Sequence, residues 1–270
     1  MIGACLKWVE RRPEVDPLTG EVATDSRTCG ASEADQAALE WALRLAEAWD
    51  DEVVAVTAGP AGAEAVLREA LAAGAARAVR VDLPAGAASE VVAAGLAGTL
   101  SGAGVVVCGD WSLDRGSGAV PAFLAGHLGA AQALGLVDVE ATGVGRVRAE
   151  RRLDGGRRER VAVAAPMVLS VEGRLRLRRA PLGGVLTALD ADIPVRPGPP
   201  VPEHLPVRTA PYRPRARVLP APRGASVRER VLALTGALVD RTPPEQLVLD
   251  PEAAADRILA QLRAWGYIDR

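Results

Sequence analysis

The fold class is decided above all by the sequence VVVCGDWSLDRGSGAVP, residues Val105–Pro121. Its β-branched start predicts a buried strand that ends near Cys108. A loop with the three glycines Gly109, Gly116 and Gly118 follows, and Pro121 is typical of the first turn of a helix. A strand, a glycine-containing loop and a helix in this order indicate an α/β protein.

The same loop is the first candidate for a binding site. Backbone N–H groups in such a loop and at a helix N-terminus favour an anion such as a phosphate. Glycines that serve turn geometry alone give the same pattern. The chain has neither GxGxxG after a strand nor GxxxxGK[ST]. The residues therefore leave a phosphate site and a purely structural loop open.

Composition limits the classes of function. The 270 residues are 49% hydrophobic but 3% aromatic, so the core must consist of Val, Leu and Ala. A net charge of −2 argues against a general nucleic-acid or membrane-surface role. Cys5, Cys29 and Cys108 are far apart and two histidines are too few for the usual metal centres, so we predict no metal site. The sequence shows neither a signal peptide nor an apolar run of membrane-spanning length, and we expect a cytoplasmic protein.

The first half of the chain alternates between strand and helix patterns. Ser32 with Asp35 three residues later predicts a capped helix start, and Gly74 is typical of a helix end. We expect strands at 2–9, 53–57, 78–81 and 105–108, helices after Ser32 and at 63–73 and 89–100, and a small hairpin at 15–22. The alternation predicts a mostly parallel sheet with helices on both faces.

After residue 130 the pattern changes to alternating polar and apolar residues. It predicts antiparallel strands at 137–147, 148–153 and 161–171, which join the sheet or form a second one. The sequence Asp154-Gly155-Gly156 is a hairpin-turn signal, and Pro166 marks a strand edge or end. The segment from Arg146 to Arg179 contains eleven arginines and four acidic residues. This region is a solvated strand face or a charged docking surface for another protein.

The end of the chain is organised differently. Residues 180–189 predict a loop that leads into a short helix, and ten of the twenty prolines lie between Pro194 and Pro222. We divide the chain into an α/β domain (1–193), a proline-rich linker (194–225) and a C-terminal helical arm (226–270). Ser226 caps a helix at 227–240, and Asp250 caps an amphipathic last helix. That helix buries its apolar face on its own domain or on a partner.

Four stretches together resemble one protein family. They are Ala4–Val9 (ACLKWV), the capped helix from Ser32 to Leu45, the strand and helix from Thr57 to Ala75, and the loop from Gly109 to Val120. Over nearly its whole length the chain is similar to the β subunit of electron transfer flavoproteins. The resemblance implies an α/β fold of the adenine-nucleotide α-hydrolase-like, Rossmann-like kind.

The resemblance also implies an AMP site, so that residues 1–193 form a nucleotide-binding domain. The residues that match the family's site are Cys5, Ser32, Glu33, Ala34, Asp35, Ala58, Gly109, Asp114, Arg115, Gly116, Ser117, Gly118, Ala119 and Val120. Ala119 and Val120 stand where the family has Gln and Thr, and Ser32 replaces an Asn. A ligand here must therefore depend on backbone groups from Gly116 to Gly118 and on the helix start.

The implied function is that of a non-catalytic electron carrier. The family consists of heterodimers in which an α subunit holds most of an FAD, and the β subunit docks dehydrogenases through a loop whose anchor leucine falls on Leu182. The opening and closing sequences are similar to a branch associated with the mycofactocin redox system. Two alternatives remain: a stand-alone adenine-nucleotide sensor, and a scaffold whose nucleotide pocket is vestigial because of Ala119 and Val120.

Overall fold

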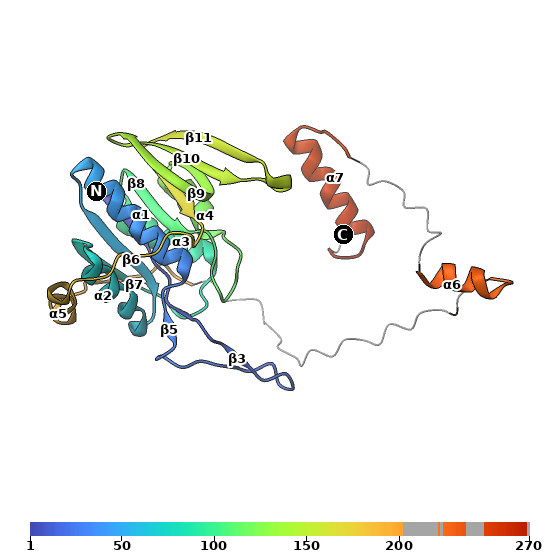
Figure 1. Ribbon diagram of the computed structural model, residues 1–270, viewed down its shortest axis with the longest axis horizontal. Coiled ribbons are helices and arrows are strands. Elements are labelled where there is room, and N and C mark those ends of the chain that lie inside the picture. Colours follow the sequence, from blue (N-terminus) through green and yellow to red (C-terminus); the bar gives the residue numbers. More distant parts are fainter. Residues whose placement is uncertain (202–220, 222–223, 236–245, 269–270) are drawn as a thin grey trace. The chain divides into compact units, whose positions relative to one another are not determined.

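A computed structural model describes residues 1–201, 221, 224–235 and 246–268 of the chain. Two compact units are present, Met1–Tyr212 and Arg213–Arg270. The first unit contains all the strands drawn in Figure 1, and the described parts of the second are helical. Among the described residues, no helix has the length and apolar character needed to cross a membrane.

The first unit alternates strands and helices as the sequence predicts. Its strands are β1 (Ile2–Cys5), β2 (Val9–Glu10), β3 (Glu14–Val15), β4 (Val22–Ala23), β5 (Cys29–Gly30), β6 (Val53–Gly59), β7 (Arg77–Asp82), β8 (Val105–Gly109), β9 (Ala131–Gly143), β10 (Arg146–Arg152), β11 (Arg158–Ala164), β12 (Met167–Val171) and β13 (Val195–Pro197). Its helices are α1 (Glu33–Trp49), α2 (Glu64–Ala73), α3 (Ser89–Leu100), α4 (Val120–Leu128) and α5 (Leu182–Asp190), with short 3₁₀ turns at Ala61–Ala63 and Asp154–Gly156.

Nine strands form one sheet in the order β11-β10-β9-β12-β8-β1-β6-β7-β13. Within this order, the neighbouring strands β9-β12-β8-β1-β6-β7-β13 pair in parallel. The strand β10 pairs antiparallel with β9 and with β11. The strand β8 lies between β1 and β12 at the centre. The short pairs β2–β5 and β3–β4 stand apart from this sheet.

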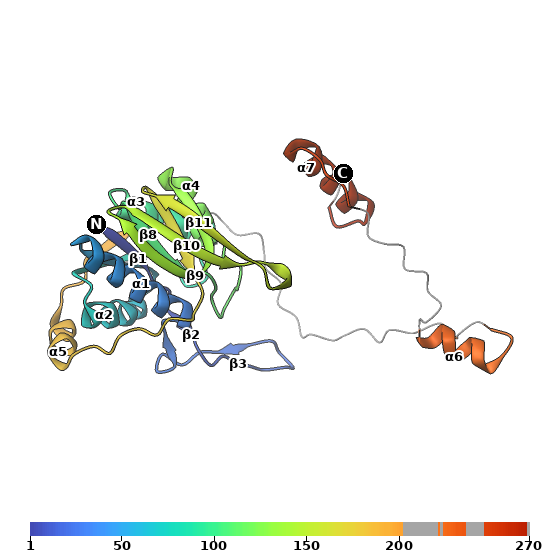
Figure 2. The same ribbon diagram turned by 45° about the horizontal axis from the view of Figure 1, so that its top comes forward.

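Helices cover both faces of the sheet, as predicted. One buried cluster joins α1 and α2 to one face, and a second joins α3 and α4 to the other (Figure 2). Small residues allow close packing: Ala37, Ala38 and Ala42 of α1 are fully buried. A Cβ on Gly3 of β1 would lie 2.7 Å from Leu100 Cδ2, so α3 packs directly on the backbone of that strand.

Two strand predictions in the second half were wrong. The turn between β9 and β10 lies at Val144 and Gly145, where Gly145 has a φ of 68°, whereas the sequence predicted it between residues 147 and 148. The expected strand at 161–171 is divided at Pro166 into β11 and β12, because proline has no N–H for the ladder. The strand β12 is moreover parallel to β8 and β9. Its five residues are all buried, which is typical of a parallel strand covered on both faces.

Other boundaries differ less. The first strand ends at Cys5, and Val9 pairs with Gly30 in the separate β2–β5 pair. Within the proline-rich stretch, Val195–Pro197 pairs with β7 as the edge strand β13, while the division of the chain into three parts stays a prediction. Helix α6 covers Val227–Thr235, and the predicted residues 236–240 lie outside the described part.

The last helix begins as predicted. Helix α7 covers Pro251–Ala264, and its N-cap Asp250 accepts hydrogen bonds from the backbone N–H groups of Glu252 and Ala253. Ile258, Trp265 and Tyr267 are largely exposed on this unit. The burial of its apolar face on its own domain or on a partner stays a prediction.

A buried carboxylate connects α1 to the segment before α5. Glu40 Oε2 accepts hydrogen bonds from the backbone N–H and Nε of Arg178 at 3.1 and 2.9 Å, and Oε1 accepts one from Arg44 Nε at 2.9 Å. Burial raises the pKa of Glu40, but the hydrogen bonds from Arg178 and Arg44 outweigh it and hold the pKa below its usual value. Arg178 also pairs with the exposed Glu47.

We predict that Glu40→Gln lowers the free energy of unfolding by about 2 kcal/mol, because several hydrogen bonds to a buried charge are lost. Glu47→Gln, which removes an exposed partner of the same arginine, should cost less than about 1 kcal/mol. Urea unfolding of both variants measures the difference. Equal losses would show that the burial of Glu40 contributes nothing.

Candidate functional site

A cavity of about 590 Å³ lies where β1, β6 and β8 end. Ligands of parallel α/β sheets bind at the carboxyl ends of strands in this way. The walls come from the residues after β1, the loop after β8, the segment between β7 and α3, and the β3–β4 hairpin. They include Cys5–Glu10, Val15, Val22, Cys29, Asp35, Ala58–Pro60, Pro84–Ala87, Ser89, Cys108, Gly109, Trp111–Arg115 and Ser117–Pro121.

One wall is the capped start of α1. Asp35 N donates a hydrogen bond to Ser32 Oγ at 3.1 Å, and the Ser32 hydroxyl and N–H donate to Asp35 Oδ2 at 2.7 and 3.3 Å. The predicted capping box is therefore confirmed. Burial raises the pKa of Asp35 to about 6, although the hydrogen bonds from Ser32 act in the opposite direction. Asp35 lines the cavity next to Gly109, where a Cβ would lie 2.9 Å from Asp35 Oδ1.

The loop after β8 is held from two sides. Lys7 Nζ donates to both Asp114 carboxylate oxygens at 2.6 Å. Burial raises the pKa of Asp114, but the hydrogen bonds from Lys7 and Ser112 hold it below its usual value. On the other side the Arg115 guanidinium donates to the carbonyl of Gly86, in the segment before α3. Both cations are thus engaged with this protein's own oxygen atoms.

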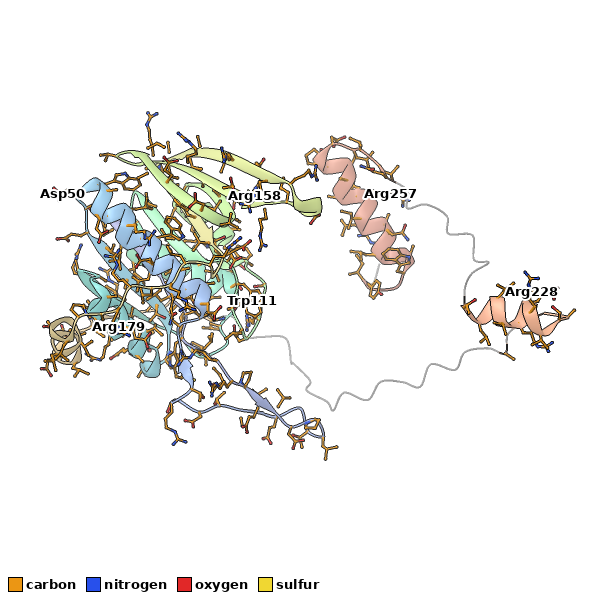
Figure 3. The ribbon with its side chains drawn as sticks, in the orientation of Figure 1. Asp50, Trp111, Arg158, Arg179, Arg228 and Arg257 are labelled. Atoms are coloured by element: carbon orange, nitrogen blue, oxygen red, sulfur yellow. The ribbon has the colours of Figure 1, made fainter. Side chains whose placement is uncertain are left out.

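Two glycines give the loop its shape. Gly116 and Gly118 have φ values of 61° and 58°, in the left-handed region that favours glycine. A Cβ on Gly116 would lie 2.6 Å from Trp111 Nε1, and one on Gly118 would lie 2.6 Å from the Asp110 carbonyl oxygen. Trp111, labelled in Figure 3, is half-exposed on this loop and lines the cavity.

Three helix N-termini reach the cavity, and they differ in how they are capped. The start of α1 is occupied by its own Ser32 and Asp35 side chains. In the described part of the chain, neither α3 nor α4 has a side-chain cap, and Ser89 and Val120, their first residues, line the cavity. Free N–H groups and the helix dipoles favour an anion at these two ends.

The structure brings together ten of the fourteen residues predicted for the site. Cys5, Asp35, Ala58, Gly109, Asp114, Arg115, Ser117, Gly118, Ala119 and Val120 line the cavity. The other four do not line it: Ser32 is buried in the capping box, Ala34 is buried beside Gly109, Gly116 packs against Trp111, and Glu33 is exposed.

The prediction missed several lining residues. Lys7 is the chain's one lysine, and that rarity was a signal that could have drawn attention to it. Trp8 and Trp111 are two of five tryptophans in a chain with few aromatic residues. The segment 84–89 and the hairpin residues Val15 and Val22 carry no sequence signal for a site, because only the fold brings them to the cavity.

Comparison with known proteins identifies the family. The profile of the family described as "Electron transfer flavoprotein domain" matches residues 19–183. The "Electron transfer flavoprotein subunit beta" of Mycobacterium tuberculosis is 32% identical over 202 residues, covering 70% of this chain and 73% of that protein. The protein of the same description from Mycobacterium leprae is 33% identical with the same coverage. The chain belongs to the electron transfer flavoprotein β-subunit family.

Membership in the electron transfer flavoprotein family assigns the chain a role in electron transfer. The matched segment contains α1, the loop after β8 and Leu182, whereas β1 and Lys7 precede it. Within the described residues, no group of three or more His, Cys, Asp or Glu side chains is placed to hold a metal ion. The association with the mycofactocin branch stays a prediction.

We predict that the stability of this family member depends on Asp35 in a defined pH range. Its folded pKa of about 6 lies above its ordinary value of 3.8, so the folded state binds the proton more tightly and loses stability as pH rises from about 4 to about 6. Asp35→Asn removes this titration. The wild type should therefore lose up to about 3 kcal/mol relative to the variant over that range. Thermal unfolding of both proteins near pH 4 and near pH 7 measures it; a pH-independent difference would contradict the assignment.

Proposed function

We propose that this chain is the β subunit of a heterodimeric electron transfer flavoprotein. In this proposal it passes electrons from a dehydrogenase through an FAD held mainly by an α subunit, and it binds a structural AMP in the cavity. The observation that carries the proposal is the loop after β8, which ends at the uncapped start of α4 in a protein of this family.

The residues of the cavity fit an adenine nucleotide. The phosphate would lie on backbone N–H groups from Gly116 to Gly118 and at the starts of α3 and α4, where no side chain of the described residues caps the helix. This arrangement needs no Gln or Thr side chain, so Ala119 and Val120 are compatible with it. The cavity volume is in the range of small-molecule sites, about 300–1,000 Å³.

The FAD supplies the redox chemistry when it is bound. We assign no catalytic residue to this chain. Its residues would position the cofactors, dock the partner proteins and exclude water. His127 is exposed on α4, which favours a surface residue over a general base. The proposed setting is the reducing cytoplasm, where Cys5, Cys29 and Cys108 would stay free thiols.

A docking surface for dehydrogenases is proposed on α5. Leu182, at the start of α5, is 75% exposed and therefore does not pack on its own domain. Leu186 and Leu189 are also exposed, at the i+4 and i+7 positions that place three leucines on one helix face. Arg68 of α2 donates to the carbonyls of Ala188, Leu189 and Ala191 at 2.7, 2.8 and 3.2 Å and holds the other end of α5.

Co-expression with a candidate α subunit from the same genome tests the function. We expect a yellow heterodimer that releases FAD and AMP in equal amounts when denatured, as measured by mass spectrometry. Gly118→Ala should lower the AMP content about tenfold, equal to about 1.4 kcal/mol, because its Cβ would meet the Asp110 carbonyl. Gly126→Ala is the matched control, since a Cβ there on α4 has nothing within 4 Å.

The outcomes separate the alternatives. If the chain stays colourless, does not associate with the α subunit and binds AMP in a calorimetric titration, the result would support a stand-alone nucleotide-binding module instead. A yellow heterodimer without AMP would retain the electron-transfer function and reject the nucleotide site, as expected for a vestigial pocket.

We predict that Leu182→Ala raises the KM of the donor dehydrogenase for this protein about 5- to 30-fold, because a docking anchor contributes roughly 1–2 kcal/mol. Flavin content and melting temperature should not change, since the side chain is exposed. Leu18→Ala, at a leucine 77% exposed on the β3–β4 hairpin, is the control for loss of an exposed leucine. Equal effects of the two substitutions would remove Leu182 from the docking surface.

A further inference from the structure

All three cysteines of the chain line the same cavity. Cys5 ends β1, Cys108 lies in β8, and Cys29 lies in β5, so three distant parts of the sequence bring thiols to one place. Two of them, Cys5 and Cys108, are also neighbours across the sheet. The proposed function uses the backbone and volume of this cavity but gives its thiols no role.

The sheet register fixes the relation between Cys5 and Cys108. The strands β1 and β8 are parallel, with Cys5 opposite Cys108. Opposite residues of adjacent strands lie about 4.8 Å apart, within the Cα separation of about 4.4–6.8 Å that disulfides span. Side chains at one register position leave the sheet on the same face, and here both line the cavity.

The two cysteines are buried in the apolar cluster of α3 and α4 and also border the cavity. Cys5 is 6% exposed and Cys108 4% exposed. Hydrogen bonding with the Cys5 thiol and burial raise the pKa of Cys108 well above its ordinary value. Cys5 is the more exposed of the two, so we take its sulfur as the one that a peroxide in the cavity meets first.

We propose that Cys5 and Cys108 form a peroxide-sensitive dithiol at the floor of the cavity. The Cys5 sulfur attacks one oxygen of hydrogen peroxide and the O–O bond breaks. The products are a sulfenic acid on Cys5 and one water. The Cys108 sulfur then displaces the hydroxyl group from that sulfenic sulfur. The thiol proton leaves with the hydroxyl as a second water. In total the two thiols lose two protons and two electrons, and one hydrogen peroxide is reduced to two waters.

Cys29 provides a matched control. Its thiol donates to Glu10 Oε2 at 3.7 Å, and burial and Glu10 raise its pKa. It lines the same cavity and is partly buried, but it has no cysteine opposite it in the β2–β5 pair. If peroxide oxidised every thiol in the cavity, Cys29 would be oxidised as well. Formation of a disulfide between neighbouring thiols would involve Cys5 and Cys108 alone.

The test treats the reduced full-length chain with hydrogen peroxide and counts free thiols after denaturation. We expect the wild type and Cys29→Ser to lose two thiols each, with a disulfide-linked peptide pair containing Cys5 and Cys108 in the mass spectrum. Cys108→Ser should instead accumulate a sulfenic acid on Cys5 that dimedone traps. Melting temperatures of the reduced proteins confirm that the serine variants are folded.

A disulfide that includes Cys29, or three free thiols at a peroxide dose that oxidises glutathione, would overturn the proposal. A parallel treatment with AMP separates this inference from the proposed nucleotide site. Slower disulfide formation with AMP supports both. Equal rates of disulfide formation with and without AMP would still support the dithiol, but they would contradict the binding of AMP over these thiols.

Discussion

The close approach between the end of β8 and the start of α1 constrains the rest of the structure. A Cβ on Gly109 would lie 2.9 Å from Asp35 Oδ1 and 3.0 Å from the backbone carbon of Ala34, so glycine alone fits there without a shift. This contact sets α1 against the central strands and fixes where the loop after β8 leaves the sheet. Asp35 is in turn held by Ser32, so neither side of the contact is free to move.

Three helix N-termini meet around the cavity, and their capping decides its electrostatics. The capping box of α1 satisfies that end with a carboxyl group of the protein, at the cost of burying an acid whose pKa is raised to about 6. The starts of α3 and α4 receive no such group from the described residues. Because Lys7 and Arg115 bind Asp114 and Gly86, the positive potential offered to a ligand comes from the backbone. A site of this kind tolerates the loss of polar side chains at Ala119 and Val120.

The sequence alone was sufficient where the signal is local. The capping box at Ser32 and Asp35 needs four residues, and the limits of α3, Ser89–Leu100, were predicted without error. Long-range pairing was not predictable in the same way. The position of β12 between β8 and β9 depends on contacts with distant strands, and the alternating pattern before Pro166 concealed it. The cavity wall at 84–89 has no local signal, because its role follows from where α3 begins.

The helices that border the cavity also carry the proposed docking helix. The chain enters α1 at the cavity, and about two turns further Glu40 binds Arg178, in the segment that leads to α5. Helix α2 starts beside the cavity residue Ala63 and presents Arg68 to the carbonyls at the other end of α5. A Cβ on Gly184 would lie 2.7 Å from the carbonyl oxygen of Ala72, so α5 packs directly on the backbone of α2. The position of α5, and with it the exposed Leu182, is therefore set by the buried Ala188, by the backbone contact at Gly184 and by the hydrogen bonds of Arg68 and Arg178 to α5 and to α1.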